Sequence, residues 1–504
     1  MSMSPVYKLI FAAGTLLFSI LFFHFFFDAQ ALDWRNAYFN VMDSFYLYRV
    51  LLEMLNGANW FVPQVYDVGY GTPYYLLSYA VIKLREGMGY GTDLLDVDTA
   101  VRVISFVPAM ALLPMYRWLQ LRLHLPKGFW LFAMLVTFSI YEFFFYCVFP
   151  KPDVLQYLLL LPVYYFLIQI REQKNLRTAI LATLFCALAA GVKMSGVFLF
   201  PWVFISAFVN LLEKNEGNFK IRELLRWGFV FAIPMALLFG CIYFLSNPRW
   251  IVSFQKNWAY VTVTQDKGWA GETVWRWEWF RVAGQLGFFL WASYFGFVVL
   301  RVRELSKNFK WALVTGEDLL AIFPMFYFTY LFCDVLRAYP LRYLFPLLPV
   351  LLITTVRFWH LIWLRFVPVE ASWQKRTAMA AVLVCLFVVG DWNRFAPGVQ
   401  QIKDIAFYES GARVEMGKYL VATYPKETKI AFYFYSWAPA YFPQARYFMG
   451  ADPDIIELLV PDVVLLTDHA RNQAFFKAVA EKSQPFRLAK RIGEFVLFER
   501  VRPG

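Results

Sequence analysis

The sequence has little charge. Only 17% of its 504 residues are Asp, Glu, Lys or Arg, whereas 60% are apolar and 21% are aromatic. An average soluble domain has about a quarter charged and about half apolar residues. The composition therefore excludes an ordinary soluble domain and predicts a polytopic α-helical membrane protein.

Cysteine and histidine are also scarce, with five and four copies. Every cysteine lies within or at the end of an apolar run, so the sequence offers neither a disulfide framework nor zinc-type spacing. The histidines, at positions 24, 124, 360 and 469, are too scattered for a metal site and are interpreted as packed or interfacial side chains. No internal repeat stands out, which argues against an inverted-repeat transporter.

Long apolar runs predict about eleven membrane spans. The first run, 9–27, is long enough to cross a hydrocarbon core of about 30 Å. Ala29-Gln30-Ala31 resembles a signal-peptidase site, but the long run and its weakly basic start favour a retained first span. The spans are expected near 9–27, 99–119, 128–149, 153–170, 178–192, 195–212, 228–245, 282–300, 318–335, 343–361 and 376–391.

The net charge of +12 is not gathered in one basic stripe, so it gives no support for nucleic-acid binding. Basic residues instead occupy the loops after alternate spans, near 117–127, 171–177, 214–226, 301–310 and 357–376. The positive-inside rule places these loops in the cytoplasm. The N-terminus is then expected on the cytoplasmic side of a bacterial inner membrane, and the C-terminus on its outer side.

After residue 391 the composition becomes that of a soluble domain. We predict a transmembrane domain over 1–391 and a small extracytoplasmic α/β domain over 392–504. In the tail, helices are expected at 410–423 and 471–482, and strands at 428–436, 462–467, 486–491 and 494–500. The tail has no Gly-rich phosphate loop and no nucleophile elbow, which favours an accessory or acceptor-recruiting role.

Two long outer loops interrupt the spans. In the first, periodic apolar residues predict amphipathic surface helices near 42–56 and 73–86, and Asp43 opens the earlier one. Tyr46 lies on the same helical face as Asp43. The second loop, 246–281, is rich in tryptophan, which is typical of an aromatic belt but also suits a platform for stacking sugars.

Ionisable residues in and near the spans collect at the predicted outer ends and leave the midplane almost empty. Such a distribution favours an enzyme that acts on a lipid headgroup over a transporter, which needs charges at the midplane. The residues concerned are Arg102, Glu142, Lys151, Asp153, Lys193, Asp334, Arg337, Arg342 and Asp391.

Acids and cations at one interface suit the transfer of a sugar from a polyprenyl phosphate. A carboxylate, for which Asp43 is the candidate, would deprotonate the acceptor hydroxyl. Arg and Lys side chains would hold the departing phosphate. Each candidate also has a structural interpretation: Asp43 and Asp153 as helix caps, Lys193 as a snorkelling lysine, and Arg337 and Arg342 as interfacial anchors.

Taken in order, these features resemble the GT-C superfamily of membrane glycosyltransferases, which includes protein O-mannosyltransferases and the lipid A aminoarabinose transferase. The resemblance covers about residues 9–391. It rests on an acid followed by tyrosines in the first loop, a Pro-Asp turn after the third span, a lysine between short spans, and an Arg-Tyr pair opening a late span. The matching residues are Asp43, Phe45, Tyr46, Tyr48 and Gly57; Pro152 and Asp153; Lys193; and Arg342 and Tyr343 with Pro346 and Pro349.

The resemblance implies a polyprenyl-phosphate-linked sugar donor, Asp43 as the base and inversion at the anomeric carbon. The acceptor would be a glycan, a lipid or a protein. Many relatives carry Asp-Glu where this chain has Asp43-Ser44, and Asp153 is the candidate for the second acid. Lys151, Lys193, Arg337 and Arg342, with Tyr46 and Tyr343, are the candidates for binding the donor and its phosphate.

No cofactor is certain, although a divalent cation remains a candidate. Asp96-Val97-Asp98 resembles a metal-binding DxD motif, but two acids at the start of the second span is the interpretation that we prefer. Two other functions stay open: a lipid or sugar-lipid transporter or flippase, and a ligase for lipid-linked oligosaccharides.

Overall fold

A computed structural model provides the structure of the chain. It describes residues 50–51, 54–55, 71–92, 94–148, 151–215, 217, 221–246, 283–330, 341–367, 372–391, 412–432, 446–447, 460–468, 473–481 and 484–501. The predicted first span and the tryptophan-rich loop lie outside these residues.

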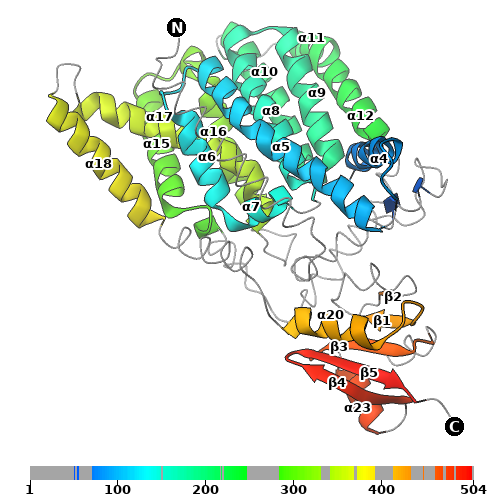
Figure 1. The fold of residues 1–504 in the computed structure, drawn as a ribbon. Coiled ribbons are helices and arrows are strands. Elements are labelled where there is room, and N and C mark those ends of the chain that lie inside the picture. Colours follow the sequence, from blue (N-terminus) through cyan, green and yellow to red (C-terminus); the bar gives the residue numbers. More distant parts are fainter. Residues whose placement is uncertain are drawn as a thin grey trace.

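The membrane region is a bundle of helices that stand side by side, with α18 at one edge and α4 and α12 at the other (Figure 1). In chain order the helices are α4 (Thr72–Gly87), α5 (Leu94–Arg122), α6 (Phe129–Ser139), α7 (Tyr141–Val148), α8 (Asp153–Gln173), α9 (Leu176–Val192), η1 (Met194–Leu199), α10 (Phe200–Lys214), α11 (Ile221–Trp227), η2 (Gly228–Ala232), α12 (Ile233–Ser246), α15 (Phe288–Lys307), η3 (Trp311–Leu313), α16 (Gly316–Tyr330), η5 (Leu341–Leu347), α17 (Leu348–Phe366) and α18 (Trp373–Gly390).

Six helical stretches of the described chain are long and apolar enough to cross a membrane: 100–122, 153–173, 194–214, 221–246, 344–366 and 373–390. Each overlaps a span expected from the sequence. The apolar helices α6 and α9 are shorter. The bundle is thus that of a multi-pass membrane protein.

The expected span at 128–149 is wrong as one continuous helix. The chain breaks at Ile140, which takes up an extended conformation between α6 and α7. The amide of Ile140 closes the last turn of α6 on the carbonyl of Thr137, and the Ser139 hydroxyl donates to the carbonyl of Val136. This tight ending redirects α7, so that Phe143 packs edge-on against Phe345.

Helix α8 is the centre of the bundle. Within the spans, 72% of α8 is buried against other helices, compared with none of α18. α8 packs against α5, α9, α10 and α16. Its Tyr157 hydroxyl bonds that of Tyr116 on α5, at 2.6 Å, and Tyr116 also bonds Thr137 on α6, at 2.7 Å. These bonds between helices satisfy hydroxyl groups that no water reaches.

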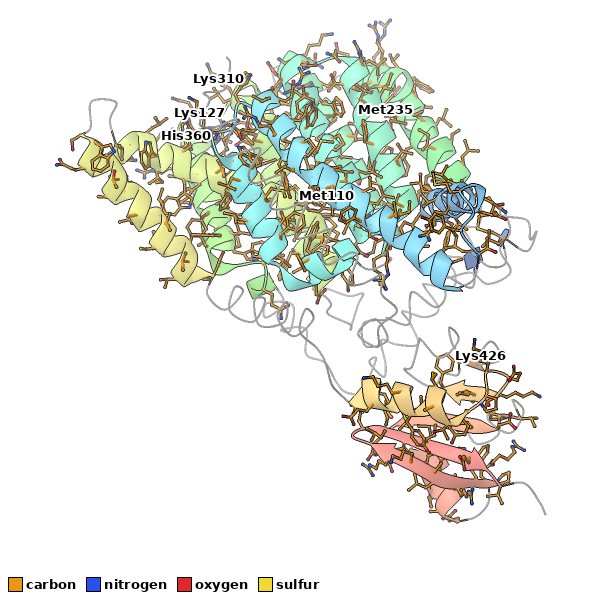
Figure 2. The ribbon with its side chains drawn as sticks, viewed as in Figure 1. Met110, Lys127, Met235, Lys310, His360 and Lys426 are labelled. Atoms are coloured by element: carbon orange, nitrogen blue, oxygen red, sulfur yellow. The ribbon has the colours of Figure 1, made fainter. Side chains whose placement is uncertain are left out.

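One end of the bundle, here named the basic-loop end, carries the predicted basic loops. Lys127, Lys310 and His360 lie together there (Figure 2). Arg357 on α17 donates to the Glu317 carboxylate on α16 and to the carbonyl of Leu123. The positive loops therefore share one end, as the sequence predicts.

Arg171, at the end of α8, also lies at the basic-loop end. Its guanidinium bonds the Asn210 amide and the Glu213 carboxylate on α10, and the carbonyls of Trp311 and Val314 in the loop before α16. α8 runs for 21 residues, about 30 Å at 1.5 Å per residue. Its first residue, Asp153, therefore lies at the opposite end, here named the site end.

The C-terminal part forms a five-stranded sheet in the order β2-β1-β3-β5-β4. β1 is parallel to β2 and β3, whereas β5 is antiparallel to β3 and β4. The elements are α20 (Ala412–Thr423), β1 (Ile430–Phe432), β2 (Arg446–Tyr447), β3 (Val463–Thr467), α23 (Gln473–Ala480), β4 (Phe486–Ile492) and β5 (Phe495–Arg500).

Strand β3 is apolar on both faces, because each face carries a helix. Val463 and Leu465 pack with α20, while Val464 and Leu466 pack with Phe475 of α23. Successive residues of a strand point to opposite faces, so a sheet covered on both sides requires a continuous apolar run. The expected helices and strands of the tail are confirmed in type, and residues 433–436 of the first expected strand lie outside the described residues.

Candidate functional site

A buried ion pair lies at the site end. Asp153 is the first residue of α8, and its carboxylate binds the ammonium of Lys193. Lys193 has an extended backbone between α9 and η1. Asp153 is 3% exposed and Lys193 is 8% exposed. An acid at a helix start and a base at a helix end both suit the helix dipoles. The two antiparallel helices therefore present opposite charges to each other.

The pair argues against two structural interpretations of these residues: Asp153 as a helix cap and Lys193 as a snorkelling lysine. Pro152, not Asp153, is the N-cap of α8 and shows no side-chain capping bond. The side chain of Lys193 is 10% exposed and binds Asp153, rather than extending into water as a snorkelling lysine would. The expected short spans on either side of Lys193 form a helical hairpin: α9 and α10 run antiparallel, and Lys174 binds Glu213 at their far ends.

Lys151 lies two residues before Asp153 and is fully buried. Its backbone is bound by the side chain of Ser105 on α5. The Ser105 hydroxyl accepts from the amide of Lys151 at 3.2 Å and donates to its carbonyl at 3.1 Å. Arg102, one turn earlier on α5, is 1% exposed. α5 therefore brings a third buried cation to the start of α8.

Gln156, one turn after Asp153, binds the segment that carries Lys193. Its amide nitrogen donates to the carbonyl of Lys193 at 2.7 Å and to that of Ala189 at 3.3 Å. The Ser195 hydroxyl donates to the amide oxygen of Gln156 at 3.0 Å. Gln156, Ser195 and Ser105 were not predicted from the sequence. Gln156 lies three positions after Asp153, and Ser105 lies three positions after Arg102. This spacing of a polar residue one turn after a charge was the signal that could have identified both.

The first loop reaches the same place. Gly71 donates its amide to the carbonyl of Val192, the residue before Lys193, at 3.1 Å. A Cβ atom on Gly71 would lie 1.3 Å from the carbonyl oxygen of Gly191, so only glycine allows this approach. α4, which begins at Thr72, matches the predicted surface helix at 73–86. The start of α4 is thus joined by its backbone to the end of α9.

An apolar cluster extends this contact. Described positions 50–51 and 54–55 are helical, as expected for the predicted helix at 42–56. Their side chains pack with α4, α5, α8 and α9. The cluster includes Val192, the residue before Lys193, and Leu155, the second residue after Asp153. The members of the cluster include Val50, Leu51, Met54, Tyr74, Tyr75, Val101, Ile104, Leu155 and Val192.

Asp43, Tyr46 and Arg337 lie outside the described residues, so their places at the site remain predictions. Arg342 and Tyr343 belong to η5, whose backbone is described, but their side chains are not. η5 packs against α7, α8 and η1. The helix that carries the Arg-Tyr pair therefore contacts the segment directly after Lys193.

Within the described part of the chain, no three His, Cys, Asp or Glu side chains gather as a metal site. Asp96 and Asp98 lie in the first two turns of α5, as the helix-start interpretation predicts. Asp391 is also a helix-end residue, since its carboxylate accepts from the amide of Phe289 at the start of α15, at 3.0 Å. This bond joins the end of α18 to the start of α15.

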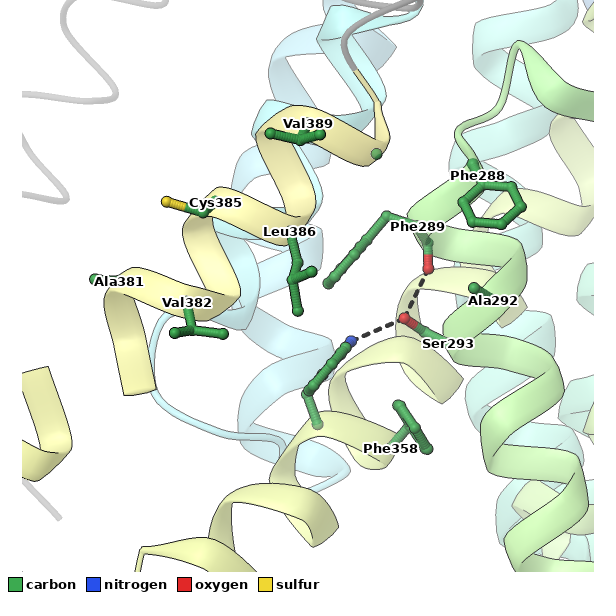
Figure 3. Close-up of a pocket in the computed structure, with 12 residues that line it drawn as sticks. Phe288, Phe289, Ala292, Ser293, Phe358, Ala381, Val382, Cys385, Leu386 and Val389 are labelled. Carbon is green, nitrogen blue, oxygen red and sulfur yellow. Dashed lines mark hydrogen bonds between the residues drawn. The ribbon is translucent and has the colours of Figure 1, made fainter. Parts of the chain in front are cut away.

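A separate apolar groove of about 720 Å³ lies between α18 and the pair α15 and α17 (Figure 3). Its one polar contact among the residues drawn is the Ser293 hydroxyl, which donates to the carbonyl of Phe289 and accepts from Trp359. The lining brings together no ionisable pair. It includes Phe288, Phe289, Phe358, Trp359, Leu386 and Val389.

No protein-family model and no curated sequence matches the chain. Among solved structures, the chain is similar to ArnT from Cupriavidus metallidurans bound to undecaprenyl phosphate, with a TM-score of 0.55, 13% identity and 98% coverage of both chains.

Two structures of the Archaeoglobus fulgidus oligosaccharyltransferase are more distant. AglB in complex with an inhibitory peptide and a dolichol-phosphate has a TM-score of 0.48, at 10% identity over 90% of this chain and 70% of that one. The complex with Zn and sulfate has a TM-score of 0.43, at 10% identity over 85% and 64%.

At 13% identity, the similarity to ArnT shows the fold alone, but it covers nearly the whole of both chains. The expected resemblance is therefore confirmed at the level of the fold: this chain has the fold of the GT-C membrane glycosyltransferases.

Proposed function

We propose that this protein is a membrane glycosyltransferase that moves a sugar from a polyprenyl-phosphate donor to an acceptor hydroxyl. The observation that carries the proposal is the buried cluster of Lys151, Asp153 and Lys193 at the site end. Buried charges are expensive in a membrane bundle and are kept mainly where they have a function. The shared fold with an undecaprenyl-phosphate-bound protein supports the same chemistry.

The charges at this cluster suit a phosphate. With Arg102, the described buried side chains around the start of α8 comprise three cations and one carboxylate, and the half-buried Glu142 on the adjoining α7 adds a second carboxylate. An excess of positive charge in a site shielded from water favours an anion. It favours the anion most as negative charge grows on the departing phosphate. Arg337 and Arg342, from the loop before α17, would complete the set.

In the proposed reaction, Asp43 takes the proton of the acceptor hydroxyl. The acceptor oxygen attacks the anomeric carbon from the face opposite the phosphate, and a new C–O bond forms. The bond from that carbon to the phosphate oxygen breaks, and its electron pair leaves with the polyprenyl phosphate. The anomeric centre inverts. Lys151 and Lys193 stabilise the departing phosphate by charge.

We assign Asp153 to this machinery through Lys193. One of its oxygens already binds the lysine, so the carboxylate holds the ammonium in place. Tyr46 and Tyr343 are proposed to contact the donor sugar or its phosphate. The packing of positions 50, 51 and 54 beside Val192 and Leu155 supports the approach of the Asp43 helix to this pair.

We further propose that the site end faces the outside of a bacterial inner membrane. The basic loops gather at the opposite end, which the positive-inside rule assigns to the cytoplasm. In this orientation the N-terminus is cytoplasmic, and residues 392–504 form an extracytoplasmic domain that recruits or orients the acceptor. The sugar would be a hexose or a pentose, and the acceptor a glycan, a lipid or a protein.

The experiment is a transfer assay with purified protein in lipid vesicles. Polyprenyl-phosphate sugars of several kinds are supplied with cell-envelope extract, and mass spectrometry follows the glycosylated product and the released polyprenyl phosphate. The proposal predicts equal amounts of both. Addition of EDTA tests the candidate divalent cation. Movement of labelled lipid-linked sugar across the vesicle without any product would instead support the transporter.

A further inference from the structure

Two buried polar residues, neither of them charged, bind the backbones of the two site lysines. Ser105 bonds both the amide and the carbonyl of Lys151, and Gln156 bonds the carbonyl of Lys193. Ser105 is fully buried and Gln156 is 3% exposed. Each lies three residues after a buried charge of the same helix, Arg102 or Asp153. Both helices thus repeat one arrangement, in which a charge is followed after one turn by a group that holds a lysine.

We infer that Ser105 and Gln156 are positioning residues, which place the ammonium groups of Lys151 and Lys193 for binding the donor phosphate. This inference rests on the proposed function. Lys151 stands just before α8, where both its amide and its carbonyl bond Ser105. Lys193 stands between α9 and η1, and its carbonyl accepts from Gln156 in addition to the amide of Gly196. A long side chain delivers its charge to one point only if its Cα atom is held.

The orientation of the Gln156 amide follows from its neighbours. Its nitrogen faces the carbonyls of Lys193 and Ala189, and its oxygen faces the Ser195 hydroxyl. A flipped amide would set oxygen against two carbonyl oxygens, so only one orientation satisfies the contacts. Gln156 therefore holds the break between α9 and η1 from one side, while Asp153 binds the ammonium of the same lysine.

Binding of undecaprenyl phosphate in nanodiscs tests the inference. Gln156→Met keeps the volume of the side chain but removes its bonds, and Gln156→Glu keeps the acceptor for Ser195 but loses both donors. Ser105→Ala removes the hydroxyl group. We expect each variant to bind at least about tenfold more weakly, because a misplaced charge loses most of its effect on the ligand. The thermal midpoint of every variant is measured beside its binding.

Matched controls lie elsewhere in the bundle. Gln169 is a buried glutamine of the same helix, but it bonds side chains at the basic-loop end, so Gln169→Met should bind like the wild type. Ser293 is a buried serine that bonds between α15 and α17, and Ser293→Ala is the control for Ser105→Ala.

A double-mutant cycle separates positioning from stability. If Gln156 acts through Lys193, adding Gln156→Met to Lys193→Met changes binding little further, whereas a general loss of structure would add to it. Wild-type affinity in the Gln156 and Ser105 variants would overturn this inference and leave the proposed function standing. Failure of the wild-type protein to bind undecaprenyl phosphate would overturn both.

Discussion

The two ends of the bundle use charge differently. At the basic-loop end, Arg171, Arg301 and Arg357 each bind an acid on another element of that end and at least one backbone carbonyl. At the site end, Asp153 and Lys193 form a buried ion pair, and Lys151, two residues before Asp153, is buried as well. The first arrangement joins segments of the chain through bonds from each arginine to acids and carbonyls, and the second gathers buried charges around the start of α8.

The free-energy cost of burying charge helps to interpret the difference between the two ends. Exposed ion pairs contribute about 0–1 kcal/mol each, so the partly exposed pairs of Arg301 and Arg357 act mainly as joints between segments. Arg171 is buried, but its guanidinium is bonded by an acid, a side-chain amide and two backbone carbonyls. Burying a charge costs several kcal/mol per ion, and an apolar pair of similar size would often be as stable. A cluster such as Lys151, Asp153 and Lys193 is therefore poorly explained by stability alone, and its retention points to function.

The largest expected effect comes from the proposed base. Asp43→Asn should lower the rate of transfer by about 10²–10⁴-fold, because the acceptor hydroxyl keeps its proton. Donor binding should change little. The control is Asp318→Asn at the basic-loop end, where the carboxylate binds Arg301 and has no part in transfer. Single-turnover transfer and donor binding are measured together. Normal turnover in Asp43→Asn would mean that another group is the base.

Next comes the comparison of two lysines of the same hairpin. Lys193→Met should reduce transfer at least about 100-fold, since a cation facing the leaving phosphate is lost. It should also destabilise the fold by about 3–5 kcal/mol, because the partner of a buried carboxylate is removed. Lys174→Met, at the other end of α9, should cost less than about 1 kcal/mol and spare transfer. Lys174 is 48% exposed.

In this pair, transfer per folded molecule and urea midpoints in detergent are the measurements. Lys193→Arg is included as a variant that keeps the charge and folds more readily. Equal losses of activity in the Lys193→Met and Lys174→Met variants would remove the distinction between the two ends.

Arg357 tests the basic-loop end from the opposite direction. Arg357→Met removes bonds to the Glu317 carboxylate and to the carbonyl of Leu123, at 2.9 and 2.7 Å. The fold should lose about 1–3 kcal/mol. The rate of transfer per folded molecule should stay at the wild-type value. Thermal unfolding and active-site-normalised transfer check this, and a specific loss of transfer without destabilisation would show that chemistry extends to this end.

The smallest expected effect is the ionisation of Tyr424 in the C-terminal domain, which belongs to neither end of the bundle. It provides a reference for measurements at high pH. Burial, and next the bond to Glu499, raise the pKa of Tyr424 well above its usual range. The protonated phenol therefore stabilises the C-terminal sheet at neutral pH. This contribution is complete below about pH 10, the usual pKa of tyrosine, and is lost as the pH rises further. Limited proteolysis of the tail between pH 8 and 11 should show this loss in the wild type, and a weaker pH dependence in Tyr424→Phe.

Much of the membrane fold could be predicted from the sequence, because hydropathy and the alternation of basic loops are strong local signals. The break at Ile140 could not, since it lies inside a largely apolar run and depends on local backbone and side-chain bonds at the end of α6. In the tail, the apolar run of β3 predicted a buried strand, but its two covering helices become apparent only from the contacts.

For the site, the sequence identified Lys151, Asp153 and Lys193 as charges at one membrane face, but not as partners. The Asp153–Lys193 pair joins residues far apart in the chain, and no periodicity reports such a contact. Gln156 and Ser105 were missed because their roles depend on backbone groups of distant segments of the chain. The catalytic assignment of Asp43 remains a prediction.

Photocrosslinking that locates the donor phosphate tests most directly whether the site end binds the donor. A polyprenyl phosphate with a diazirine beside its phosphate is bound to the protein in vesicles and irradiated, and peptide mass spectrometry maps the adducts. The account predicts adducts at the site end, within residues 151–157 and 189–199, that are lost in Lys193→Met. Adducts confined to the basic-loop end, around residues 171–177 and 301–318, would contradict it.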